Sequence, residues 1–203
     1  MKWLGNAPRR GKGISWGVPW KKGELEINQL GTIQSIGGQP IQNKIMGYWP
    51  DGSVKWTGHA AILDENTQLI FGKDEVKEEA EIATEKFNGI YIDNGTMTAY
   101  FPKKGEGWNV LDWIKMDGNE KVSDFQTFVQ IDSKQTIAKV DEVIIEENGP
   151  LKAVVKVTAS IREKTELDYQ FILRFKFYRN QHEVNINHTV VIGNDQSIEG
   201  IAL

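Results

Sequence analysis

The chain has 203 residues, a formal net charge of −4, 39% hydrophobic residues and no cysteine. The lack of cysteine excludes a disulfide framework, a zinc site built from thiolates and a cysteine nucleophile. The acidic balance leaves no basic surplus for a nucleic-acid backbone, and no apolar run approaches the ~20 residues of a membrane span, so neither partner is expected.

The two ends of the chain bear on its cellular compartment and on whether it is part of a longer protein. The first six residues lack the apolar core of a signal peptide, so we expect a cytoplasmic protein, or a secreted one whose leader is absent from this chain. The segment from Ser197 to Leu203 looks like the start of a strand, whereas natural domains more often end in a polar tail or a completed element. We therefore expect the N-terminal portion of a longer protein, truncated at its C-terminus. A short, complete gene product is the alternative.

The first predicted element is a β-hairpin around residue 50. Strands are expected at residues 41–49 and 54–63. Between them, Pro50-Asp51-Gly52-Ser53 predicts a tight turn, because proline presets φ at the first central position and glycine relieves strain at the end. Val54, Trp56 and Gly58 then alternate with polar residues, as in a half-buried strand.

The next segment, residues 73–83, is rich in charge and carries apolar residues at Val76, Ala80 and Ala83. This spacing is compatible with a helix, but such stretches are usually solvated connectors. We place a domain boundary here and expect two domains, residues 1–85 and residues 86–203.

The remainder of the chain predicts an all-β sandwich. Asn-Gly and Asp-Gly pairs recur between short runs rich in β-branched and aromatic residues. In residues 169–177, Tyr169, Phe171, Leu173, Phe175 and Phe177 share one strand face, with polar residues and Tyr178 on the other. Strands are expected at residues 89–101, 125–131, 140–146, 151–161, 167–178 and 182–192.

Several of these segments resemble one family. Gly17 to Gly23 (GVPWKKG) and Tyr48 to Thr57 (YWPDGSVKWT) resemble the N-terminal domain of the exo-rhamnogalacturonan lyase (YetA-like) family of polysaccharide lyases. Asn148 to Val155 (NGPLKAVV), Arg174 to Tyr178 (RFKFY) and His188-Thr189 resemble its next region, a pattern that recurs in several carbohydrate-active β-sandwiches. The resemblance implies a small RIFT-like β-barrel followed by part of an antiparallel β-sandwich, and a pectic substrate.

Tryptophans are the first candidates for substrate binding. Trp16, Trp20 and Trp49 lie next to predicted turns, and their ring faces could stack on sugar rings of a pectic oligosaccharide or polysaccharide. Core packing is the alternative, because buried aromatic residues dominate small β cores.

Catalysis would need several groups. A lyase of this kind neutralises the uronate carboxylate, removes the C5 proton and protonates the departing oxygen; Arg or Lys suits the first task, and His, Tyr or Lys the others. The catalytic candidates are Lys55, His59, Arg179 and His188, and no spacing assembles them. The resemblance associates the catalytic groove with a later part of the protein, so this chain is expected to hold little of the catalytic set. We expect no cofactor and no metal site, since no calcium-loop acidic cluster is present.

Three functions remain open. The first is the N-terminal portion of a rhamnogalacturonan lyase, which scaffolds the catalytic region and lines the sugar groove together with the remainder of a longer polypeptide. The second is a non-catalytic carbohydrate-binding module. The third is a structural or oligomerisation domain without sugar contact.

Overall fold

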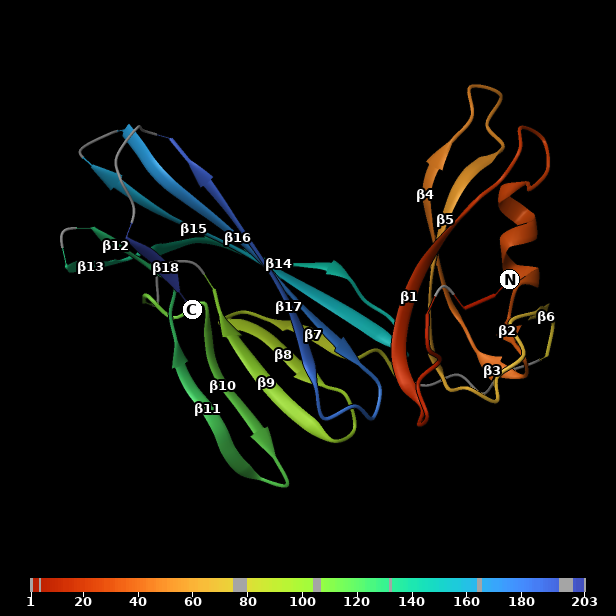
Figure 1. Cartoon of the computed structure of the whole chain (residues 1–203), viewed down its shortest axis with the longest axis horizontal. Helices are drawn as coiled ribbons and strands as arrows, with labels where there is room; N and C mark the ends of the chain where they lie inside the picture. The colour runs from red at the N-terminus through yellow and green to blue at the C-terminus, as the bar shows by residue number, and fades with distance from the viewer. Residues whose placement is uncertain are drawn as a thin grey trace. The chain divides into compact units, whose positions relative to one another are not determined.

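In the computed structural model the chain forms two units (Figure 1), Met1–Glu81 with Gly149–Lys152 and Ile82–Asn148 with Ala153–Leu203. The structure describes residues 2, 3, 5–74, 80–103, 107–131, 133–163, 166–193 and 199–202. Both units are built of antiparallel strands, which confirms the predicted all-β fold. No helix in the described part of the chain is long and apolar enough to cross a membrane.

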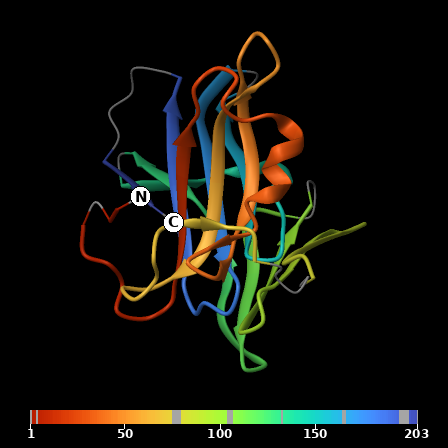
Figure 2. The same cartoon turned by 90° about the vertical axis from the view of Figure 1, so that its right-hand side faces the viewer.

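The described residues of the first unit form two small sheets and one 3-10 helix. One sheet has the order β1-β5-β4, whose strands run side by side in Figure 2, and the other has the order β3-β2-β6. The helix η1 spans Ile27–Thr32. The strands are β1 Lys12–Pro19, β2 Ser35–Ile36, β3 Gln39–Pro40, β4 Gln42–Tyr48, β5 Val54–Leu63 and β6 Phe71–Gly72.

The hairpin between β4 and β5 confirms the predicted turn. The backbone nitrogen of Gly52 donates to the carbonyl oxygen of Trp49 at 2.9 Å, and Gly52 has a φ of +89°. The Asp51 carboxylate accepts hydrogen bonds from the backbone nitrogen and the hydroxyl of Ser53, at 3.2 and 2.7 Å. Proline, aspartate and glycine thus act at the positions where the turn needs them.

In the second unit, the part of the chain that the structure describes forms three sheets. A five-stranded sheet has the order β11-β10-β9-β8-β7, a four-stranded sheet has the order β14-β15-β16-β17, and a three-stranded sheet has the order β13-β12-β18. The strands are β7 Ala83–Lys86, β8 Gly89–Asp93, β9 Met97–Pro102, β10 Leu111–Met116, β11 Asn119–Phe125, β12 Phe128–Ile131, β13 Lys134–Ile137, β14 Lys139–Glu147, β15 Lys152–Glu163, β16 Glu166–Tyr178, β17 Val184–Ile192 and β18 Gly200–Ala202.

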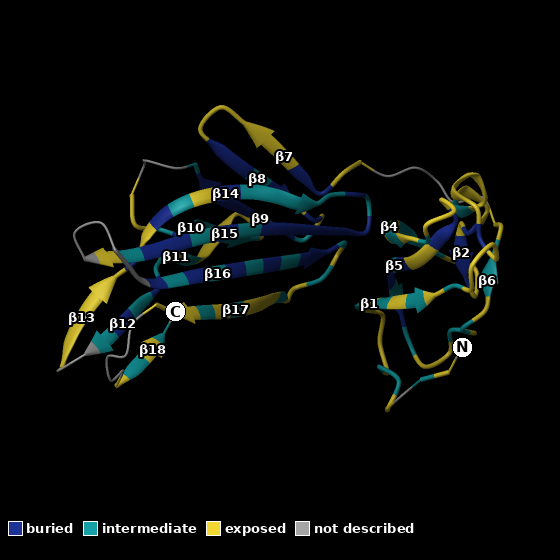
Figure 3. Ribbon diagram, turned by 90° about the horizontal axis from the view of Figure 1, so that it is seen from above, coloured by how far each residue is buried: buried dark blue, intermediate teal, exposed yellow. Residues whose placement is uncertain are grey.

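The two larger sheets of this unit enclose a common core. In Figure 3 the buried residues of these strands are dark blue. Phe101 of β9 meets Phe175 of β16 edge-on, with ring centroids 5.0 Å apart. The face predicted for residues 169–177 is confirmed, since each of its five apolar residues is at most 1% exposed. Tyr178, expected on the polar face, is buried as well at 5% exposure, because the strand ends there against a neighbouring turn.

That turn corrects one prediction, because residues 89–101 form the hairpin of β8 and β9 and not a single strand. Asn94 in the turn is fully buried. Its side-chain nitrogen donates to the carbonyl oxygens of Tyr178 and Gln181, both at 2.9 Å, and its oxygen accepts from the backbone nitrogens of Thr96 and Met97. One amide therefore ties the β8–β9 turn to the turn after β16.

Of the segment considered for a helix, residues 75–79 lie outside the described residues. The domain boundary expected between residues 85 and 86 falls inside β7. The four residues Gly149–Lys152, at the turn between β14 and β15, belong to the first unit. There the Gln42 side chain accepts hydrogen bonds from the backbone nitrogens of Leu151 and Lys152 and donates to the Lys152 carbonyl oxygen, at 3.0, 2.9 and 3.0 Å.

Candidate functional site

Two of the three candidate tryptophans, Trp20 and Trp49, belong to a series of hydrogen bonds across the β1-β5-β4 sheet. The Trp49 indole nitrogen donates to the Trp20 carbonyl oxygen at 3.0 Å, and the Trp20 indole nitrogen donates to the Thr57 hydroxyl at 2.9 Å. The Thr57 hydroxyl lies 2.7 Å from His59 Nε2, and His59 Nδ1 lies 2.8 Å from Asn43 Oδ1. These hydrogen bonds fix the turn after β4 relative to the middle of β5.

The proton positions on His59 follow from its neighbours. Asn43 donates through Nδ2 to the Ile33 carbonyl oxygen at 2.5 Å, so its Oδ1 faces the imidazole and accepts from Nδ1–H. Nε2 then accepts the Thr57 hydroxyl proton. The ring is 3% exposed, and burial lowers its pKa from 6.5 to about 4. His59 is thus a neutral imidazole, and both of its nitrogens already hold partners.

The three tryptophans proposed as a sugar platform are each half-buried. Trp16 stacks on His59, with centroids 5.5 Å apart, and packs against the core of the unit. The Lys55 ammonium group lies 4.7 Å from the centre of the Trp49 ring, and Lys55 itself is exposed. In this unit, the Lys55–Trp49 pair is therefore where an anionic ligand would meet both a cation and a ring.

The sequence pattern missed the exposed aromatic surface on the other side of β5. Alternation suggested that Trp56 would be on the buried side, yet it is 43% exposed, while Thr57 and His59 are buried through their mutual hydrogen bond. The indole of Trp56 lies across Gly17, where an added Cβ would be 2.5 Å from its nitrogen. Gly17 is in register with Gly58, so Trp56, two positions before Gly58, lies diagonally opposite Gly17. A glycine diagonally opposite an aromatic residue is the signal for this arrangement, and it can be recognised only once the strand register is known.

The remaining catalytic candidates lie in the second unit. His188 on β17 stacks on Phe171 at 5.7 Å, and its Nε2 lies 3.3 Å from the Thr127 hydroxyl. Burial lowers the pKa of His188. Arg179 follows the last residue of β16 and belongs to the turn before β17. Lys55 and His59 thus belong to one unit and Arg179 and His188 to the other, and their catalytic roles stay predictions.

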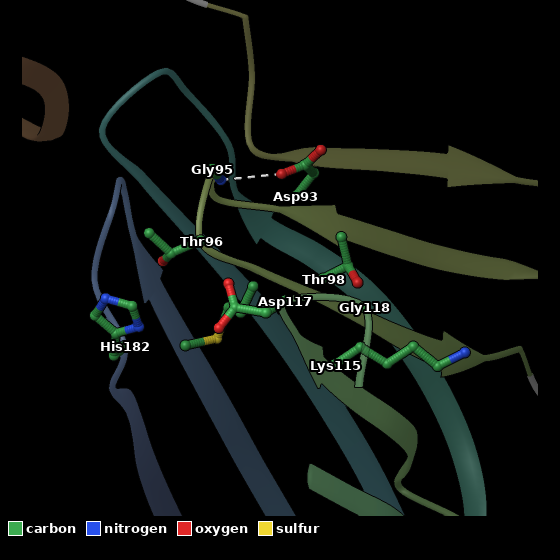
Figure 4. A pocket seen from close by; sticks show the side chains of 9 residues that line it. Asp93, Gly95, Thr96, Thr98, Lys115, Asp117, Gly118 and His182 are labelled. Atoms are coloured by element: carbon green, nitrogen blue, oxygen red, sulfur yellow. Dashed lines mark hydrogen bonds between the residues drawn. The ribbon is translucent and has the colours of Figure 1, made fainter. Parts of the chain in front are cut away.

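A polar hollow of about 360 Å³ opens in the second unit (Figure 4). Lys115, His182 and two carboxylates contribute to its wall, and in Figure 4 the Lys115 ammonium group points away from His182. Asp93 accepts a hydrogen bond from the Gly95 backbone nitrogen at 2.9 Å, which shapes one edge. Such a mixture of donors and acceptors suits a hydroxylated ligand. The hollow is lined by Asp93, Gly95, Thr96, Met97, Thr98, Lys115, Asp117, Gly118 and His182.

Within the described residues, no group of three or more His, Asp or Glu side chains is placed to hold a metal ion.

Comparison with known proteins identifies the family. Residues 82–203 match the model described as the PcRGLX-like protein central beta sandwich domain. The chain belongs to the PcRGLX-like family. Residues 1–76 match the PcRGLX-like N-terminal RIFT barrel domain, which confirms the predicted order of a RIFT-type barrel and a β-sandwich.

One curated relative of this PcRGLX-like chain is protein YetA of Bacillus subtilis (strain 168), which is described as uncharacterized. The two are 28% identical over 219 residues, an alignment that covers 98% of this chain and 25% of YetA. The chain thus spans a quarter of the length of that relative. The family predicted from the segments around residues 17–23 and 48–57 is confirmed.

Proposed function

We propose that this chain is the N-terminal portion of a carbohydrate-active enzyme that cleaves rhamnogalacturonan by β-elimination. In this proposal the barrel and the sandwich scaffold a catalytic region that follows them and line one side of its sugar groove. The observation that carries it is the consecutive match to the N-terminal and central domains of the PcRGLX-like family, in a chain that covers 25% of YetA.

The chemistry of the candidate residues supports a scaffolding role. In β-elimination a base removes the C5 proton, the C4–O bond breaks as the C4=C5 double bond forms, and the departing oxygen takes a proton. A base needs a free lone pair facing the substrate. The only lone pair of the neutral His59 ring already accepts the Thr57 proton inside the sheet. We therefore propose that His59 positions Trp16 and Trp20 and does not transfer the proton.

A contribution to sugar binding is supported by the Lys55–Trp49 pair. A lysine ammonium can pair with a uronate carboxylate, and an indole face can stack on the apolar face of a pyranose ring. Trp20 holds the Trp49 indole through its carbonyl oxygen, so the ring is oriented before a ligand arrives. We propose Lys55 and Trp49 as the part of the barrel that borders the groove.

The test compares the 203-residue chain with YetA on rhamnogalacturonan I backbone oligosaccharides, by following the ultraviolet absorbance of the unsaturated uronide. We expect YetA to produce the signal and the chain alone to produce none. Activity of the chain alone that is lost in Lys55→Ala or His188→Ala would overturn the scaffolding role. A flat trace for both proteins would overturn the lyase function and leave a binding or structural module.

A further inference from the structure

The outer face of the five-stranded sheet carries aromatic residues where a solvent-facing surface is expected. Strand pairing puts Thr84, Tyr91, Tyr100, Trp113 and Ser123 next to one another in a single line across β7, β8, β9, β10 and β11. The apolar residues next to them along the strands point the other way and belong to the core of the sandwich, namely Ala83, Ile90, Ile92, Ala99, Phe101, Ile114 and Val122. The aromatic residues of this line therefore do not belong to that core.

Tyr91, Tyr100 and Trp113 form a compact aromatic triad. Their ring centroids are 4.6 Å (Tyr91–Tyr100), 6.0 Å (Tyr100–Trp113) and 6.5 Å (Tyr91–Trp113) apart. The Tyr100 plane is tilted by 31° to Tyr91 and by 34° to Trp113, and the outer two differ by 63°, so the planes turn progressively across the sheet. Tyr100 is 9% exposed, whereas Tyr91 and Trp113 are only half-buried. The open ring surface thus belongs to Tyr91 and Trp113.

Tyr100, the central ring of the triad, is held in place by its contacts with Asn88 and Gly89. The Tyr100 hydroxyl donates to the Asn88 carbonyl oxygen at 2.7 Å. Its ring lies against Gly89, where an added Cβ would collide with the ring and with the Phe101 carbonyl oxygen. A fixed ring surface loses little conformational entropy when a ligand stacks on it, and such surfaces are favoured in binding sites.

Each outer ring of the triad is capped by a lysine. The Lys86 ammonium group lies 4.6 Å from the Tyr91 ring centre, and the Lys115 ammonium group lies 4.4 Å from the Trp113 ring centre. Exposed cation–π contacts change an equilibrium constant by only about two- to fivefold. A ligand that stacks on these rings can therefore move the lysines aside at small cost, and an acidic ligand can pair with them afterwards.

Other charged groups surround the triad. Asp93, Thr98, Lys115 and Glu120 form the neighbouring line across β8 to β11. The carboxylates of Asp93 and Glu120 are suited to accept hydrogen bonds from sugar hydroxyls. Asp93, Thr98 and Lys115 also line the polar hollow in Figure 4, so the triad and the hollow share one surface.

We propose that the triad is a binding platform for a uronate-bearing saccharide. One pyranose ring stacks on Tyr91 and Trp113, the lysine caps move to its carboxylate, and the next sugar residue extends toward the hollow. A neutral sugar must displace the same lysines without receiving an ion pair in return, so the platform prefers acidic sugars. The choice of a uronate among acidic ring ligands rests on the proposed function, whereas the platform itself rests on the geometry.

The test is a titration of the chain with trigalacturonate and, separately, with a neutral galactotriose, followed by calorimetry. We expect trigalacturonate to bind at least about tenfold more tightly, with the advantage declining as salt is added. Trp113→Ala should weaken binding about tenfold, as expected when an anchoring ring is lost. Trp108→Ala is the matched control, since Trp108 lies in the same unit, is 51% exposed and is outside the triad.

A second variant keeps the test decisive if Trp113→Ala impairs folding. The double substitution Lys86→Gln, Lys115→Gln leaves the rings in place, and we expect it to remove the preference for the acidic trisaccharide. Equal affinity for the two sugars, or binding unchanged by both variants, would overturn the platform. If the chain fails to bind while YetA still produces unsaturated uronide, the platform is wrong and the proposed function stands. Binding at the triad without YetA activity would support the platform and overturn the proposed lyase function.

Discussion

Protonation of His59 should destabilise the barrel at acidic pH. The native ring has a pKa of about 4 against 6.5 in the unfolded chain, so between these values the unfolded state binds one more proton than the native state. The free energy of unfolding therefore falls as the pH drops from 6.5 to 4, by up to about 1.4 kcal/mol per pH unit and about 3 kcal/mol in total. Above pH 6.5 this contribution no longer changes.

The measurement is urea unfolding followed by tryptophan fluorescence at several pH values. Five of the seven tryptophans precede residue 82, so the signal reports mainly on the first unit. His59→Gln removes the titrating ring, and the difference between wild type and variant cancels the carboxylates that titrate in both. The same pH dependence in both proteins, or a ring pKa near 6.5 in an NMR titration of His59, would contradict the buried neutral ring.

Two substitutions test packing in the second unit. Gly89→Ala should cost about 2 kcal/mol of stability, because its Cβ would collide with the Tyr100 ring and with backbone; Gly200→Ala, with no atom within 4 Å of its Cβ, is the control, and equal urea midpoints would contradict the close approach. Asn94→Ala should cost about 3 kcal/mol, because it leaves buried carbonyl and amide groups unpaired. The exposed Asn187→Ala should be near neutral in the same assay, and an equally small loss for Asn94→Ala would show that the two turns do not depend on the Asn94 amide.

Local features of the fold were predictable from the sequence. The turn at residues 50–53 and the apolar face of residues 169–177 depend on neighbouring residues only, and both are confirmed. The largely apolar character of residues 89–101 predicts a single strand there, whereas the structure has the two strands β8 and β9. The break lies at Asn94-Gly95, an Asn-Gly pair of the kind that marks a hairpin turn. What a local pattern does not reveal is that the Asn94 side chain donates to carbonyl oxygens more than 80 positions away.

The candidate site was harder to predict because it depends on strand register. The exposed Trp56 face of β5 arises because Thr57 and His59 satisfy one another inside the sheet, against the usual order of apolar-in and polar-out. Tyr91, Tyr100 and Trp113 come from three strands, and only the pairing of β8, β9 and β10 brings them together. The spacing of these aromatic residues along the chain does not predict that they are in contact.

The residues Gly149–Lys152 have a practical consequence for anyone who divides this protein. Expression of residues 82–203 alone would carry these four residues away from the first unit, to which they belong. The backbone nitrogens of Leu151 and Lys152 would then lose their hydrogen bonds to the Gln42 side chain. Leu151 is only 6% exposed in the whole chain. A barrel expressed as residues 1–81 would in turn lose the three hydrogen bonds between the Gln42 side chain and the backbone of residues 151 and 152. The two family domains follow one another in sequence, at residues 1–76 and 82–203, yet no single cut between them leaves residues 149–152 with the first unit.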